Sequence, residues 1–241
     1  MDRVRSSSPG HWCVRKLTAA ELKAKPRVKA TFAGSKATGA TRMRVYLVRH
    51  AETDWSASGR HTSRTELRLT ANGERRAARV GPLLARLRGR DVPAPAVPAP
   101  AVLSSPRRRA VRTAELAGLP SPMIVDDLAE WDYGEYEGLT TSQIRQSVPG
   151  WTVWTHPCPG GETAQDVTNR ADRVLAQAAR LRAVGDVVLV GHGHFSRVLA
   201  ARYLGLAATA GVCFALDAGG ITVLGLERGV PRLDHVNITP D

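Results

Sequence analysis

The sequence predicts an α/β fold, a three-layer α/β/α sandwich in which helices cover both faces of a mostly parallel central sheet. Short apolar runs typical of buried strands alternate with longer segments whose apolar residues recur at helical spacing. The chain has 241 residues, 43% of them hydrophobic, which is enough for one sizeable core. In such a fold we expect ligands at the carboxyl ends of the strands.

Five segments have the length and apolar content of buried strands. They are 44–48, 101–104, 123–125, 187–190 and 221–226. The segments between them are polar or helical, as βαβ units require. The order therefore favours parallel pairing.

Four helices are expected, at 70–87, 105–117, 162–183 and 195–204. Thr70 is a suitable cap for the first, and Pro82 should kink or interrupt it. Ser105 and Pro106 form a cap and first-turn pair that opens the second. The third has apolar residues at helical spacing, and the fourth follows a strand directly.

The first 42 residues differ in composition from the rest. They hold 10 Lys or Arg, including all five lysines, and only 2 acidic residues, whereas 43–241 is close to balanced in charge. We predict a basic, disordered extension at 1–42 and a folded domain at 43–241. A misassigned start upstream of a true beginning at Met43 is the explanation we favour. A tether to nucleic acid or an anionic surface and a targeting peptide are the alternatives.

Composition also limits the partners. No apolar stretch approaches the roughly 18–20 residues of a membrane span, so no membrane partner is expected. Because the positive charge is concentrated in the extension, we do not expect nucleic acid as a partner of the domain. The three cysteines are odd in number and predict reduced thiols in a cytoplasmic protein. A homodimer is only a base-rate expectation.

Phosphoryl transfer through a histidine needs a particular set of groups. A neutral imidazole must face the phosphorus, fixed cations must hold the phosphoryl oxygens, and an acid must protonate the leaving oxygen. Arginine suits those oxygens better than lysine does. The strand-end or helix-start residues that could fill these roles without a metal are Arg49, His50, Arg109, Glu130 and His192.

Other interpretations of the same residues stay open. His192-Gly-His194 has a spacing that can suit zinc, but no third ligand cluster lies nearby in the sequence, so we expect no metal and no cofactor. Arginines at 107–109 and 112 open a helix, where the dipole disfavours cations. A bound anion would relieve that conflict, and a solvated basic face would explain at least two of the four.

The aromatic residues after Glu130 have two equally good interpretations. They could wall the entrance of a site or simply pack in the core. The residues concerned are Trp131, Tyr133, Tyr136, Trp151 and Trp154. His61 and His156 lie in expected loops and have no assigned use.

Four motifs in this order resemble the histidine phosphatase superfamily, also called the phosphoglycerate mutase-like family. They are LVRHAET at 47–53, SSPRRRA at 104–110, LAEWDYG at 128–134 and VGHG at 190–193. The resemblance spans essentially 43–241 and implies that family's fold. It implies that His50 is the phosphorylated nucleophile and Glu130 the proton donor. Arg49, Arg109 and His192 would complete the phosphate pocket.

Flanking residues are assigned by the same resemblance. Ser56 occupies a pocket position usually held by Asn, and Thr62-Ser63 matches a Thr-Gly pair on the substrate loop. The resemblance also implies that Gly193 and His194 bind substrate. Ala51 replaces the usual Gly, which could narrow the room beside the phosphate.

Within the superfamily, the sequence is most similar to bacterial acid phosphatases and sedoheptulose-bisphosphatase-like enzymes, through EWDYGEYEGLTTSQIR, WTHPCPGGET and GHGHFSRVLAARYLG. We therefore expect a metal-independent phosphomonoesterase acting on small phosphorylated metabolites such as sugar phosphates. A cofactor-dependent phosphoglycerate mutase is the alternative. Mutases carry a longer insertion than the 61 residues between Glu130 and His192. A non-catalytic phosphate-binding or scaffold protein is the third hypothesis.

Overall fold

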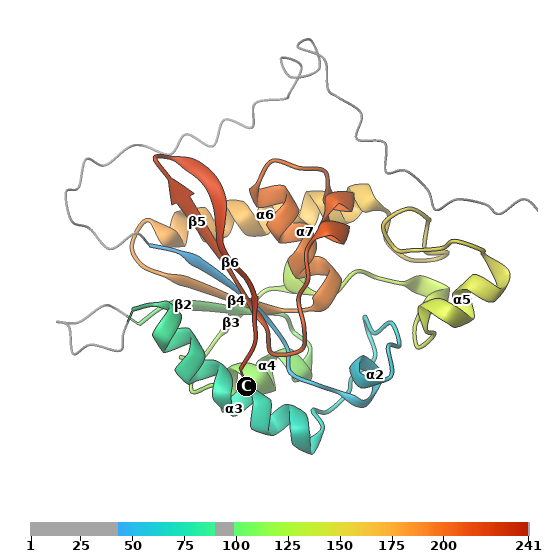
Figure 1. The fold of residues 1–241 in the computed structure, drawn as a ribbon, viewed down its shortest axis with the longest axis horizontal. Helices are drawn as coiled ribbons and strands as arrows, with labels where there is room; N and C mark the ends of the chain where they lie inside the picture. Colours follow the sequence, from blue (N-terminus) through green and yellow to red (C-terminus); the bar gives the residue numbers. More distant parts are fainter. Residues whose placement is uncertain (1–42, 90–98, 241) are drawn as a thin grey trace, which may run out of the picture. The chain divides into compact units, whose positions relative to one another are not determined.

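The computed structural model describes residues 43–89 and 99–240, so the predicted extension at 1–42 lies outside the described residues. A six-stranded sheet in the order β3-β2-β4-β1-β5-β6 forms the centre (Figure 1). Its strands are β1 (Val45–Arg49), β2 (Ala101–Ser104), β3 (Met123–Ile124), β4 (Val187–Gly191), β5 (Ile221–Glu227) and β6 (Val230–Ile238). The strands β3, β2, β4 and β1 pair in parallel, and β5 and β6 are antiparallel. The predicted mostly parallel sheet is confirmed.

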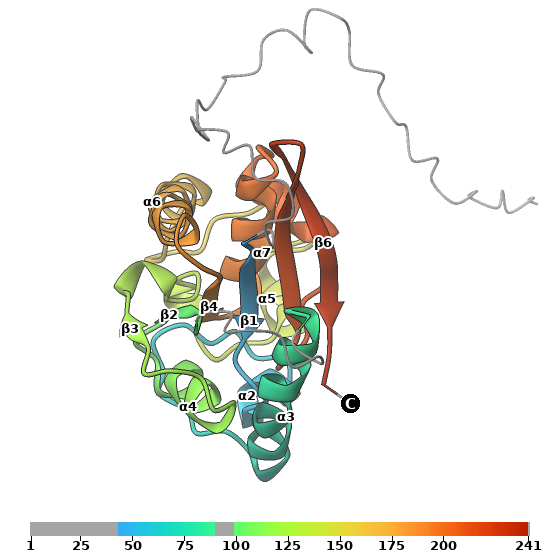
Figure 2. The ribbon, with the colours of Figure 1, turned by 90° about the vertical axis from the view of Figure 1, so that its left-hand side faces the viewer.

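Helices cover both faces of the sheet (Figure 2). On one face lie α3 (Ala71–Leu87) and α4 (Arg108–Leu116), and on the other α6 (Ala164–Arg182) and α7 (Gly193–Tyr203). The shorter elements are α2 (Asp54–Ala57), α5 (Thr141–Ser147) and the 3₁₀ turns η1 (Asp126–Leu128), η2 (Gly134–Tyr136) and η3 (Ala208–Cys213). Among the described residues, no helix has both the length and the apolar character that crossing a bilayer takes.

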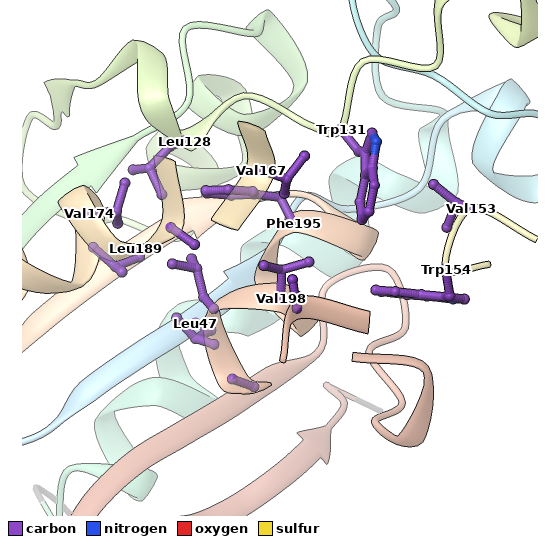
Figure 3. Packing of buried hydrophobic residues seen from close by; sticks show 14 of the residues in the cluster. Leu47, Leu128, Trp131, Val153, Trp154, Val167, Val174, Leu189, Phe195 and Val198 are labelled. Atoms are coloured by element: carbon purple, nitrogen blue, oxygen red, sulfur yellow. The ribbon is translucent and has the colours of Figure 1, made fainter. Parts of the chain in front are cut away.

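Alternation along β1 divides the core into two layers. Val45 and Leu47 belong to the cluster packed on α6 and α7, whereas Tyr46 and Val48 belong to the one packed on α3 and α4. Side chains of a strand point to opposite faces in turn, so a strand buried on both faces reads as a continuous apolar run. Figure 3 shows part of the first cluster, in which Phe195 of α7 lies with side chains of the sheet.

The helix that begins after Thr70 runs without a break through Pro82. Thr70 caps it as predicted, because its hydroxyl accepts the Gly73 N–H at 2.9 Å. Because the helix is continuous, the expected interruption at Pro82 is wrong, whereas the kink, the other outcome expected there, stays a prediction. Val80 and Leu83 are buried in the second core cluster, and this burial outweighs the one backbone bond that proline removes.

The second predicted helix begins later than expected. α4 starts at Arg108 instead of directly after Ser105. The Ser105 hydroxyl accepts the Arg107 N–H at 3.3 Å and also contacts His192. Glu66 accepts the Arg108 N–H at 3.0 Å, so a carboxylate of the chain meets the helix dipole there. Ser105 therefore serves the site instead of capping the helix.

Candidate active site

His50 follows β1 directly and its ring is held by backbone. The His50 N–H donates to the Gly191 carbonyl at 2.9 Å, which fixes the chain at the end of β4. Nδ1 lies 2.7 Å from the Ala51 carbonyl oxygen. Because a carbonyl only accepts, Nδ1 carries the proton and Nε2 keeps its lone pair. Burial first, then the charges of Arg109 and Arg49, hold the pKa of His50 well below 6.5, so the ring is neutral.

The peptide that positions His50 is itself fixed by α4. Ala51 is fully buried, and its N–H donates to the Thr113 hydroxyl at 3.0 Å. That hydroxyl donates to the Arg109 carbonyl at 2.7 Å. The methyl of Ala51, at the position where the resemblance led us to expect Gly, is thus accommodated in packed surroundings.

His192 lies between β4 and α7, fully buried beside the first histidine. The ring centroids of His50 and His192 are 5.2 Å apart. Nε2 of His192 is 2.8 Å from the Ser105 hydroxyl, while Nδ1 is buried without a hydrogen-bond partner among the described residues. Burial, followed by the charge of Arg109, holds the pKa of His192 well below 6.5. Both histidines are therefore neutral in a site that arginines make positive.

Arg109 in α4 is fully buried and anchored by backbone. Its Nη1 donates to the Thr65 carbonyl at 2.9 Å, and Nη2 donates to the carbonyls of Thr62 at 3.2 Å and Ser63 at 3.0 Å. Burial lowers the pKa of Arg109, although a guanidinium keeps its charge at neutral pH. The loop at 62–65 thus holds the cation in one orientation.

Arg49 at the end of β1 approaches the start of α7. Its Nη1 donates to the Leu216 carbonyl at 2.8 Å. A Cβ on Gly193 would lie 3.3 Å from both Cζ and Nε of Arg49, closer than most such contacts. Gly193 therefore leaves the room that the guanidinium occupies.

Buried nitrogens without partners mark where a ligand fits. Among the described residues, four buried side-chain nitrogens lack a hydrogen-bond partner: Nε of Arg49, Arg107 and Arg109, and Nδ1 of His192. Unpaired buried donors are costly unless a ligand satisfies them. Arginine nitrogens can only donate, so the ligand must supply acceptors and negative charge. A phosphoryl group, with three acceptor oxygens, meets both conditions.

Glu130 lies at the N-terminus of α7. Its Oε1 accepts the N–H groups of Trp131 at 2.9 Å and Phe195 at 2.8 Å, and Oε2 accepts the His194 N–H at 3.0 Å. These three bonds fix the carboxyl group at the edge of the cleft, with only 6% of the residue exposed.

A cleft of about 270 Å³ joins these groups. Its lining includes the predicted residues Arg49, His50, Ser56, Thr62, Glu130, Gly193 and His194. Arg109 and His192 are fully buried next to it. Ser63 is not brought to the cleft, because its N–H donates to Glu137 and its carbonyl accepts from Arg109. Its backbone supports the site instead.

The cleft also contains residues that the sequence did not single out. These are Gly59, Arg60, Thr141, Arg197 and Leu216. Of these residues, only Arg197 could have been expected from the sequence, because it lies one helical turn after Gly193, a predicted site residue. His61, which had no assigned use, and Tyr133 of the aromatic group also line the cleft. Trp131, Trp151 and Trp154 are buried in the core cluster, and Tyr136 packs against it. Tyr133 belongs to the same cluster and also lines the cleft, so it alone of the five does both.

A larger hollow of about 560 Å³ lies beside α4, lined by the loop at 67–69 and by arginines of the helix. Arg109 lines it, but neither histidine of the site nor Glu130 does. Arg112 there is paired with Glu74 and Glu115. No group of three or more His, Cys, Asp or Glu suited to a metal ion occurs in the described ranges. We therefore place the site in the smaller cleft.

The chain belongs to the histidine phosphatase superfamily (branch 1), whose family model matches residues 45–239. An acid phosphatase of Mycobacterium tuberculosis is 45% identical over 201 residues, which cover 83% of this chain and 95% of that protein. Sedoheptulose 1,7-bisphosphatase of Saccharomyces cerevisiae is 31% identical over 191 residues, 68% of each. The resemblance inferred from the motifs is confirmed.

Solved structures agree with this assignment. A structure of an open reading frame product from Mycobacterium tuberculosis is 45% identical, with a TM-score of 0.77, and the match covers 83% of this chain and 99% of the other. A mycobacterial glucosyl-3-phosphoglycerate phosphatase, solved with VO3, is 26% identical with a TM-score of 0.68, and the match covers 82% of this chain and all of the other. The phosphoglycerate mutase-like fold is confirmed.

Proposed function

We propose that this protein is a metal-independent phosphomonoesterase that hydrolyses small phosphorylated metabolites, such as sugar phosphates, through phosphohistidine at His50. The observation that carries the proposal is the set of unpaired donors on Arg49, Arg109 and His192 beside a neutral histidine. Family membership supports phosphatase chemistry, and relatives are named acid phosphatase and sugar bisphosphatase.

In the first step Nε2 of His50 attacks the phosphorus and the ester P–O bond breaks. The proton on Nδ1, held by the Ala51 carbonyl, makes Nε2 the nucleophilic nitrogen. Arg49, Arg109 and His192 stabilise the charge on the phosphoryl oxygens. The Ser105 hydroxyl donates to Nε2 of His192. The proton of this neutral ring is then on Nδ1, and the Nδ1–H of His192 becomes one of the donors to the phosphoryl oxygens.

Glu130, in its acid form, gives its proton to the leaving oxygen, and the alcohol departs. In the second step water attacks the phosphorus of phospho-His50 and the N–P bond breaks. Glu130 takes the proton of that water, inorganic phosphate leaves, and His50 is neutral again. The three backbone N–H groups that hold the carboxyl keep it in place for both steps.

A phosphoglycerate mutase is the second candidate. It would retain phospho-His50 and return the phosphoryl group to the substrate. Proteins named probable phosphoglycerate mutase are 30% identical over 177 residues. The short stretch between Glu130 and His192 favours hydrolysis, because little chain is available to shield the intermediate from water.

We propose a cytoplasmic enzyme without a nucleic-acid partner and with a small phosphorylated metabolite as its ligand, and a homodimer remains an expectation. Within the described ranges, Cys158 and Cys213 are free, and the expectation of a reducing compartment stays a prediction.

The proposal is tested by phosphate release from a panel of esters, with His50→Ala as the control. The panel comprises nitrophenyl phosphate, sugar mono- and bisphosphates, phosphoserine and 3-phosphoglycerate. Release that depends on His50 is the expected result, and the ranking of rates would define the substrate class. Conversion of 3-phosphoglycerate to its 2-isomer without release would establish the mutase instead. If the folded protein shows neither activity, the binding or scaffold hypothesis is the one that remains.

A further inference from the structure

We infer that Glu137 is a positioning residue for the proposed reaction: through the loop at 62–65 it fixes the guanidinium of Arg109 for the reacting phosphoryl group. The inference rests on the proposed phosphatase function and adds to it a residue that contacts neither substrate nor nucleophile. Glu137 follows the turn η2 and is not among the described residues that line the cleft. Its contribution to turnover must therefore pass through its neighbours.

The carboxylate of Glu137 holds the loop through two backbone N–H groups. The Ser63 N–H donates to both oxygens, at 3.0 Å to Oε1 and at 2.8 Å to Oε2. The Thr65 N–H donates to Oε1 at 3.0 Å. Because the acceptor is charged, these bonds are stronger than those between neutral groups. One side chain, more than 70 residues further along the sequence, therefore fixes the centre of the loop.

The carbonyl groups of the same loop hold Arg109, through the bonds from Nη1 to Thr65 and from Nη2 to Thr62 and Ser63. The peptide unit between Thr62 and Ser63 therefore has its carbonyl on the guanidinium and its N–H on the carboxylate. Hydrogen bonds at both ends of a peptide group polarise it and strengthen one another. Glu137 and Arg109 are thus opposite charges that the backbone of the loop joins without direct contact.

The indirect contact has a consequence for the charge of Arg109. The residue is fully buried, yet it forms no salt bridge with any residue in the described part of the chain. A carboxylate in direct contact would offset the positive charge that the phosphoryl oxygens need. Three carbonyl dipoles orient the guanidinium instead and leave that charge for the ligand. The carboxylate of Glu137 stabilises the dipoles from the far side of the peptide groups.

Other contacts fix the ends of the loop. At one end the backbone of His61 bonds that of residues 138–139, with N–O distances of 2.8 and 2.9 Å. At the other end Glu66 binds the start of α4. Between them Arg64 pairs with Asp132, but the Arg64 side chain is 73% exposed, and exposed pairs contribute little. The orientation of the central peptide groups therefore depends on the one carboxylate that accepts their N–H groups.

Glu137→Ala tests the inference, with nitrophenyl phosphate as the substrate because its leaving group needs no acid. Loss of the carboxylate frees the centre of the loop, so Arg109 loses its fixed orientation. A misplacement of about 1 Å can cost about 10²-fold in rate, and we expect kcat/KM to fall roughly 10- to 100-fold. Glu137→Gln keeps the size of the side chain and one acceptor oxygen. It should reduce kcat/KM by a smaller factor, and it carries the test should Glu137→Ala not fold.

A double-mutant cycle separates positioning of Arg109 from a general structural role. Arg109→Lys keeps the positive charge but lacks the planar fork that reaches three carbonyl groups. In that background, Glu137→Ala should lower kcat/KM less than about threefold, because the group through which Glu137 acts is already gone. Vanadate, an oxyanion whose binding needs no turnover, gives a second readout. Its Kd, measured by calorimetry, should rise roughly tenfold in Glu137→Ala relative to the native enzyme.

Glu135→Ala is the matched control. Glu135 lies in η2, two residues before Glu137, and is exposed. The substitution removes the same charge from the same segment, but it leaves the bonds to Ser63 and Thr65 intact. We expect kcat/KM for nitrophenyl phosphate and the Kd of vanadate to stay within about twofold of their native values. Thermal unfolding of each variant shows whether the fold is retained.

The outcomes distinguish the inference from the proposed function. Native kcat/KM and native vanadate affinity in folded Glu137→Ala would overturn the positioning role and leave the phosphatase intact. The same loss in the native and the Arg109→Lys backgrounds would overturn it as well, because Glu137 would then act elsewhere. Absence of His50-dependent phosphate release would instead remove the proposed function. The Kd of vanadate alone would then decide whether Glu137 orients Arg109 for an oxyanion, and an unchanged Kd would contradict it.

Discussion

At the scale of single residues, hydrogen bonds to backbone decide which atoms can react. The Ala51 carbonyl places the proton of His50 on Nδ1, and three N–H groups orient the carboxyl of Glu130. None of these bonds depends on a mobile side chain. The nucleophile and the acid are therefore both preorganised before substrate arrives.

Replacing Glu130 by Gln should separate its role in protonation from its role in structure. We expect kcat/KM for alkyl phosphates, which reports the phosphorylation step, to fall about 10²–10⁴-fold, the usual contribution of a general acid. Nitrophenyl phosphate, whose leaving group needs no proton, should lose less than about tenfold in kcat/KM. Steady-state kinetics on both esters measure the contrast, and equal losses would remove Glu130 from the acid role.

His61 should make stability depend on pH. Burial lowers its pKa from 6.5 to about 4. The unfolded chain then binds a proton between these values that the folded protein does not, so stability is full above 6.5 and is lost as pH falls. The cost is about 1.4 kcal/mol per pH unit, or about 3 kcal/mol by pH 4.

Denaturant unfolding between pH 7 and 4 would measure this effect. His61→Phe keeps a ring beside Tyr133 and Trp151, with which His61 now packs. The slope of unfolding free energy against pH should be shallower in the variant by about 1.4 kcal/mol per unit. Parallel curves for the two proteins would show that His61 titrates normally.

At the scale of elements, the ends of β1 and β4 and the starts of α4 and α7 converge on one point. β1 and β4 pair in parallel, so Arg49 lies next to Gly191 at the same edge of the sheet. This edge could be predicted, because strand-end residues follow apolar runs in the sequence. The hydrogen bond between His61 and Thr141 in the cleft could not be predicted, because the two residues are 80 positions apart and no local sequence pattern links them.

Some helices and strands could not be predicted from the sequence, for physical reasons. β6 lies at the edge of the sheet and is largely exposed, so its sequence lacks an apolar run. α2 and α5 have four and seven residues, too short for a helical pattern to emerge. Ser105 looked like a helix cap because its preference for such positions is local, whereas its partner His192 is distant in sequence.

The start of α7 offers a test at this scale. Gly193→Ala should push the Arg49 guanidinium aside, because the new Cβ would lie 3.3 Å from its Cζ. We expect kcat/KM to fall roughly tenfold with little change in Tm, since alanine favours the helix. Gly185→Ala, where a Cβ meets nothing within 4 Å, is the matched control. Equal activity in both variants would show that the close approach does not matter.

At the scale of the whole molecule, the charge of the domain at 43–241 is nearly balanced. Three of its 24 arginines line the cleft, and a local concentration of four lies at 107–109 and 112 around the start of α4. Glu66 offsets part of that concentration through Arg107 and the Arg108 N–H. The sequence predicted that an anion would offset the arginines at the start of α4, and the Glu66 carboxylate supplies part of that negative charge. The unpaired buried nitrogens described above remain for a ligand.

Fixed arginines and neutral histidines should make turnover independent of added metal. We expect phosphate release to be unchanged by dialysis against EDTA and by later addition of Mg²⁺ or Zn²⁺. The charges on Arg49 and Arg109 already do what a metal ion does for phosphoryl oxygens. Loss of activity in EDTA, restored by one of these ions, would revive the zinc hypothesis for His192 and His194.

The central claim is that His50 carries the phosphoryl group, and trapping that intermediate tests it most directly. The native enzyme and Glu130→Gln would be quenched in alkali within milliseconds of mixing with nitrophenyl phosphate, whose leaving group needs no acid, and the phosphorylated peptide identified by mass spectrometry. We predict acid-labile phosphate on His50, approaching one per chain in the Glu130 variant and absent in His50→Ala. Turnover without any phosphoenzyme, persisting in His50→Ala, would contradict the mechanism.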